Sequence, residues 1–133
     1  MRNEEIICNF ENDAVPEDSF HHADHVRLAF AYLCEYPVLQ ALEKFASALK
    51  RFATARGKTQ LYNETITWAL MLLIRERMAR AGHQQVWVEF AAHNPDLFNW
   101  KDSVLKKYYR EETLASELAK GTFLFPDKVI PCP

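Results

Sequence analysis

Apolar positions recur with a helical period along most of the chain. In the stretch 38–56 they are spaced three and four residues apart, which places them on one face of an amphipathic helix. That face carries Leu42, Phe45, Ala46, Leu49, Phe52 and Ala53. Before it, Asp18 or Ser19 is a suitable N-cap for a helix that runs to about Tyr36, where Pro37 would end or kink it. The pattern therefore predicts two consecutive helices that meet at Pro37.

A third helix is expected over about 60–81, with Thr59 as its cap. Its middle, from Ile66 to Ile74, is apolar nearly all round. A helix without a polar face is typical of a buried position. We therefore expect this helix to be the central buried element of the fold.

Shorter helices are expected in the last third of the chain. One covers about 84–93 and stops before Pro95. Another starts at Asp102 or Ser103 and reaches toward Lys120, with a break near Glu112. These segments complete a helical pattern that covers most of the sequence.

The two ends read as extended segments, and the composition agrees with an all-helical class. Residues 1–18 offer Ile6, Ile7 and Phe10 as anchors, and the tail from Phe123 to Pro126 would dock on the helices. The 133 residues suit one domain, and only 3 Gly and 6 Pro leave few tight β-turns. We predict an all-α fold: a compact single-domain bundle (1–133) of five to six helices with extended N- and C-terminal segments.

Charge and cysteine content narrow the partners and the compartment. Lys and Arg number 16 against 18 Asp and Glu, so nothing favours nucleic acid or an anionic membrane as a partner. No run of 18 apolar residues exists that could span a bilayer. The cysteines are Cys8, Cys34 and Cys132, an odd number without metal-type spacing, and the N-terminus lacks the apolar core of a signal peptide. We therefore expect a cytoplasmic protein.

Candidate chemistry begins with two histidines at the start of the first predicted helix. On a helical wheel His22 aligns with Val26 and Leu33, and His25 lies about 60° to one side. Two imidazoles one turn apart can bind one transition metal, but a third donor must then come from another helix. The alternative is that carbonyls or hydroxyls satisfy both histidines in a polar pocket.

A second polar intrusion lies at the start of the most apolar helix. Glu64 aligns with Trp68 and Met71, on a face expected to become buried one turn later. A carboxylate there is costly unless it is paired, hydrogen-bonded or metal-bound. The alternative is that Glu64 stabilises the N-terminus of its own helix, where negative charge is favoured.

Three stretches, Phe20–Ala29, Leu61–Thr67 and Ser116–Asp127, together resemble a family of small uncharacterised bacterial helical proteins. Its members carry F-x-H-A-x-H-L-R-x-A and then Y-H-E-T-x-T. The resemblance implies a polar cluster of His22, His25, residue 63 and Glu64.

Asn63 departs from this family pattern, because it stands where the pattern has His. An amide binds transition metals less well than imidazole does. Asn63 is therefore expected beside the ligands, where a hydrogen bond to His22 or His25 would fix the tautomer of that ring.

These residues leave three functions open. The first is a metal-dependent or acid–base enzyme, with His22 and His25 as ligands or proton-transfer groups, Glu64 as a ligand or general base, and a divalent transition metal as cofactor. The second is a non-catalytic module that binds a small-molecule ligand. The third is a structural or adaptor protein whose histidines only satisfy the core. The sequence leaves the reaction, the identity of the metal and the oligomeric state open, and a homodimer is one of the states it allows.

Overall fold

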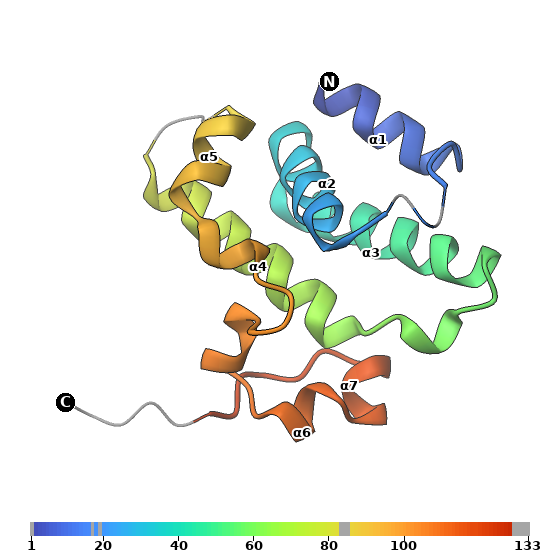
Figure 1. Ribbon diagram of the computed structural model, residues 1–133, viewed down its shortest axis with the longest axis vertical. Coiled ribbons are helices and arrows are strands. Elements are labelled where there is room, and N and C mark those ends of the chain that lie inside the picture. The colour runs from blue at the N-terminus through green and yellow to red at the C-terminus, as the bar shows by residue number, and fades with distance from the viewer. Residues whose placement is uncertain (1, 17, 19, 83–85, 129–133) are drawn as a thin grey trace.

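Helices and short helical turns make up most of the described chain (Figure 1). The computed structural model describes residues 2–16, 18, 20–82 and 86–128. In these ranges the α-helices are α1 (Asn3–Glu11), α2 (His22–Glu35), α3 (Val38–Ala55), α4 (Glu64–Arg80), α5 (Trp87–His93), α6 (Glu111–Leu114) and α7 (Glu117–Gly121). Single turns of 3₁₀-helix lie between them at Thr59–Leu61 (η2), Pro95–Phe98 (η3) and Val104–Lys107 (η4). The described residues form no strand, and the predicted all-α class is confirmed.

The central helix is α2, not α4 as the sequence suggested. Every residue from Leu28 to Leu33 is buried, because α2 packs against α1, α3, α4 and η3. In α4, Leu70 is buried but Ile66 and Leu72 are 37% and 38% exposed. α4 runs between α2 and α3 on one side and α7 on the other, and these neighbours leave part of its surface exposed to solvent. An apolar pattern reports what could be buried, but not which sides of a helix its neighbours cover.

The N-terminal segment is a helix where an extended chain was expected. The anchors Ile7 and Phe10 are both buried, and their spacing of three residues places them on one face of α1, against α2. Two hydrogen bonds also join α1 to α2. Arg27 donates to the Asn3 side chain over 2.7 Å, and the Tyr32 hydroxyl donates to Glu11 over 2.6 Å. Ile6, Ile7 and Phe10 span little more than one helical turn, which was too short a stretch to establish the helical period in the sequence.

The junction between α2 and α3 follows the prediction, but the start of α2 does not. α2 ends at Glu35 and α3 begins directly after Pro37. At the other end, α2 begins at His22 rather than after Asp18, and Ser19 lies outside the described residues. Asp24 accepts a hydrogen bond from the backbone N–H of His21 over 2.9 Å, which stabilises this later start.

The last third of the chain consists of short helical turns and an extended tail. Of the helix expected at about 84–93, α5 covers Trp87–His93; Val86 is its N-cap, and residues 84 and 85 lie outside the described residues. The long helix expected up to Lys120 is instead divided into η4, α6 and α7, with breaks at 108–110 and 115–116. Residues 122–128 have no helical structure and dock on α4, as predicted for the tail.

Candidate functional site

His22 is held by a main-chain carbonyl. Its Nε2 atom lies 2.8 Å from the carbonyl oxygen of Leu97, and a carbonyl can only accept. Nε2 therefore carries a proton and donates it to Leu97. The residue is half-buried, and its ring centroid lies 6.0 Å from that of Trp100. This is the arrangement expected of a histidine that is satisfied by the fold.

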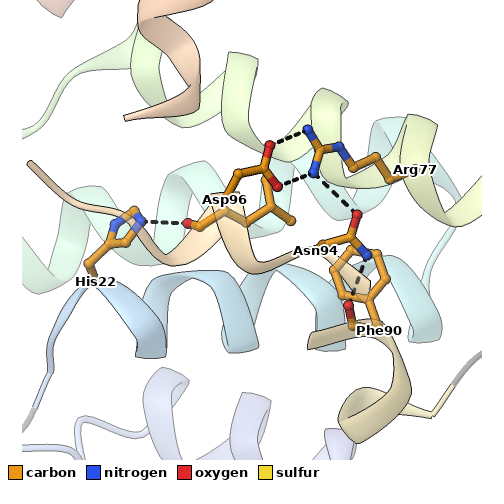
Figure 2. A network of polar contacts seen from close by, with 6 residues as sticks. His22, Arg77, Phe90, Asn94 and Asp96 are labelled. Carbon is orange, nitrogen blue, oxygen red and sulfur yellow. Dashed lines mark hydrogen bonds and ion pairs between the residues drawn. The ribbon is translucent and has the colours of Figure 1, made fainter. Parts of the chain in front are cut away.

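The segment that receives His22 is itself fixed by a polar network (Figure 2). Arg77, near the end of α4, contacts both carboxylate oxygens of Asp96 at 2.5 and 2.7 Å. The Asn94 side chain accepts from Arg77 over 3.2 Å and donates to the carbonyl of Phe90 over 2.8 Å. The Arg77 guanidinium holds the pKa of Asp96 below its usual range. Together with His22, these contacts join the start of α2, the end of α4 and the end of α5.

Sequence reasoning did not single out Arg77, Asn94 or Asp96 as partners. The pairs are separated by 17 and 19 residues, so no local spacing marks them. Asp96 directly follows Pro95, but this gave little indication of an ion pair, because aspartate next to proline is usual in turns.

His25 packs into an aromatic cluster. Its ring centroid lies 4.3 Å from that of Phe20, and Phe20 in turn lies 4.8 Å from Phe10 and 5.0 Å from Phe52. Burial, and then the nearby charge of His22, lower the pKa of His25 to about 4. His25 is therefore a neutral imidazole at pH 7, and its charged form is disfavoured in the folded state.

Glu64 interacts with the tyrosine that precedes it by two residues. The Tyr62 hydroxyl donates to Glu64 Oε1 over 2.5 Å, and Lys50 Nζ lies 5.2 Å from the centroid of the Tyr62 ring. Burial and the bond to Glu64 raise the pKa of Tyr62, so this phenol stays protonated. Glu64 is also the first residue of α4, where its negative charge is favoured. Both observations agree with the structural alternative for Glu64.

Asn63 is the N-cap of α4, a role that the sequence analysis gave to Thr59. Its side-chain oxygen accepts from the backbone N–H of Ile66 over 2.9 Å, and its amide nitrogen donates to the Leu114 carbonyl over 2.8 Å. Asn63 thus begins α4 and ties it to α6. The expected hydrogen bond from Asn63 to His22 or His25 was wrong, since both ends of the amide are used elsewhere.

The structure does not bring Glu64 to the histidines. Glu64 begins α4, and Arg77 lies roughly 20 Å further along the same helix at a rise of about 1.5 Å per residue. His22 bonds to the residue after Asp96, the partner of Arg77, so it lies near the opposite end of α4. Among the described residues, no three His, Cys, Asp or Glu side chains are placed to hold a metal ion. The expected metal set of His22, His25 and Glu64 is therefore not assembled.

An open cavity of about 370 Å³ lies at the C-terminal end of α4, away from Glu64. Its lining is Arg77, Arg80, Ala81, His93 and Asn94. Arg77 pairs with Asp96, and Arg80 pairs with Glu76 over 2.8 Å. These carboxylates neutralise both arginines, so the cavity offers little net charge to an anion.

Comparison of the chain with protein-family models, curated proteins and solved structures found no match. The family resemblance therefore stays a prediction. One residue of the resembling tail has a clear structural role here: Asp127 accepts from the backbone N–H of Arg110 over 3.0 Å and from the Thr113 hydroxyl. Within the described ranges, every helix is too short or too polar to cross a membrane.

Proposed function

We propose that this protein is a non-catalytic adaptor, and that its histidine and Asn-Glu motifs hold the fold together. The observation that carries the proposal is the bond from His22 Nε2 to the Leu97 carbonyl. Glu64 and Asn63 are engaged in the same way, with Tyr62 and with Leu114. Each of these side chains therefore commits at least one polar atom to a contact within the fold.

The adaptor surface that we propose surrounds Trp100. This residue is 71% exposed, and Val88 on α5 is 75% exposed. Trp87, which precedes Val88 on α5, packs edge-on against Phe98 of η3 at 5.7 Å, so α5 lies against the segment that leads to Trp100. Exposed tryptophan is typical of the anchors that dominate protein interfaces. The network around His22 would then serve to hold this surface in place.

The cytoplasm is the compartment that we propose for this adaptor. Cys8 is an exposed free thiol and Cys34 a partly buried one. Free thiols suit a reducing environment.

The second candidate is a proton-transfer or metal site at His22 and His25 alone. One observation favours it: Nε2 of His22 is directed at the Leu97 carbonyl, so Nδ1 is the ring nitrogen left to face a ligand. Metal-bound histidines are commonly oriented by such a carbonyl bond. The charge of His22 also acts on His25, so the two rings are close.

Calorimetric titration with Zn²⁺ at pH 7.5 separates the two candidates. The adaptor proposal predicts no saturable binding below about 1 mM in the native protein. It also predicts that His22→Ala lowers the free energy of unfolding, because the Leu97 carbonyl loses its donor. Micromolar Zn²⁺ binding that is lost in His22→Ala would overturn the adaptor proposal and favour the metal site.

A further inference from the structure

Residues 122–128 form an extended segment whose inner edge is bonded to side chains and, at Lys128, to the main-chain carbonyl of Tyr108 over 3.0 Å. The Thr65 hydroxyl donates to the Thr122 carbonyl over 2.7 Å and accepts from the Leu124 N–H over 3.1 Å. The Tyr109 hydroxyl donates to the Leu124 carbonyl over 2.7 Å. In an extended chain, backbone groups of alternate residues point to the same side. The even-numbered positions therefore face the protein, where α4 and Tyr109 take the place of a neighbouring strand.

The outer edge of this segment has no hydrogen-bond partner among the described residues. Within the part of the chain that the structure describes, nothing bonds to the backbone N–H and C=O groups of Phe123 and Phe125. Buried backbone groups are almost always paired, so these groups face water, and Phe125 is 82% exposed. Pro126 belongs to the inward-facing set with Leu124, so its missing N–H does not interrupt the outer edge. The segment thus presents a free strand edge.

Aromatic rings lie along one face of the same segment. Phe123 stacks on Trp68 of α4 with centroids 5.4 Å apart, and Phe125 meets Phe123 edge-on at 5.9 Å. Proteins usually protect a free strand edge with charged side chains. Here Asp127 is turned toward Thr113, and Lys128 donates to the Lys106 carbonyl over 2.9 Å. The edge and its row of rings are therefore left without that protection.

We propose that residues 122–126 pair antiparallel with the same segment of a second copy, about a two-fold axis at Leu124. In this register Phe123 of each copy lies opposite Phe125 of the other, and each such pair exchanges two backbone hydrogen bonds. Side chains that lie opposite each other share a face, so the exposed Phe125 ring would be covered by Phe123 of the second copy and by the Trp68 next to it.

A second copy fits because the edge is complementary to itself. Its two free backbone positions meet their own counterparts, and its aromatic face continues into an identical one. The contact is short and lies at the small end of protein interfaces, so the dimer is weak and depends on concentration. This inference concerns a different surface from that of the proposed adaptor, and does not rest on it.

Sedimentation velocity from about 5 to about 500 µM tests the pairing. The native chain is expected to show a reversible monomer–dimer equilibrium. Phe125→Ala should weaken association at least tenfold. Phe125→Pro should abolish it, because proline removes an N–H that has no partner among the described residues and that donates across the proposed dimer. Leu39→Ala, at a residue 76% exposed on α3, is the matched control and should change nothing.

Circular dichroism and urea midpoints at the lowest concentration check that each variant is folded. If Phe125→Pro unfolds, the result for Phe125→Ala decides alone. The Phe125 ring is exposed, so its removal should leave the fold intact. A native chain that stays monomeric over the whole range overturns the proposal, and so does a dimer that both Phe125 variants retain. A monomer that binds an extended peptide at this edge would also overturn it, in favour of a foreign strand.

Discussion

Acidification from pH 7.5 to 5 should destabilise the protein through His25. The pKa of this imidazole is about 4 in the folded protein, against 6.5 for the ordinary side chain. The unfolded chain thus binds a proton below about pH 6.5, whereas the folded chain resists it down to about pH 4. The stability that neutral His25 allows is therefore complete above pH 6.5 and is lost as the pH falls toward 4.

The size of this loss follows from the two pKa values. The difference of about 2.5 units corresponds to about 3 kcal/mol in total, of which about 2 kcal/mol is lost by pH 5. Carboxylates contribute little in this window, because in unfolded chains they titrate near pH 4. The groups nearest to His25 that carry charge are His22 and Asp24, and both remain in the variant described next.

Urea unfolding at pH 7.5 and pH 5 measures the effect. We expect the native protein to lose about 2 kcal/mol over this range, and His25→Leu to lose much less, since leucine cannot take up a proton. His93→Ala, at an exposed histidine of α5, is the control and should keep the native slope. An equal pH slope in the native protein and His25→Leu would refute the burial of His25 as its cause.

Three further predictions concern stability. Leu70→Ala should lower the free energy of unfolding by about 2–5 kcal/mol and Leu72→Ala by under about 1 kcal/mol, because of the two only Leu70 is buried. Equal losses in urea unfolding would contradict the one-sided burial of α4. Asn63→Ala should lower the free energy of unfolding by about 1–2 kcal/mol, and Asn63→Asp by less, because aspartate keeps the oxygen that caps α4. If thermal unfolding shows equal losses for the two variants, Asn63 does not act as the cap. A double-mutant cycle with Arg77→Ala and Asp96→Ala should give a coupling of about 1 kcal/mol, reduced by partial exposure, and zero coupling would count against the network.

The sequence predicted best those elements whose signal is local. The amphipathic period over 38–56 gave α3 to within one residue at its end, and Pro37 marked the junction with α2. α1 was not predicted because its anchors Ile6, Ile7 and Phe10 span little more than one turn and do not establish a period. Burial of α4 was overestimated, since which sides of a helix are covered is a property of the whole fold.

The candidate site failed for a geometric reason. Helical wheels report the direction of a side chain around its axis, but not its position along it. His22 and Glu64 both start on apolar stripes, yet they lie near opposite ends of α4. The contacts that do form at His22 are with Leu97, which is 75 residues away in sequence. No spacing rule could have identified that carbonyl.

The most direct test of the account is the protonation of the His22 ring, because the central claim is that this ring donates to the Leu97 carbonyl. Two-bond ¹⁵N–¹H correlation spectra of the imidazoles at pH 7.5, with and without excess Zn²⁺, report which nitrogen carries the proton. We predict that Nε2 of His22 carries a proton and that the resonances of this ring do not shift on addition of Zn²⁺. A proton on Nδ1 alone, or a shift of the Nδ1 resonance on saturation with Zn²⁺, would contradict the structural role of His22.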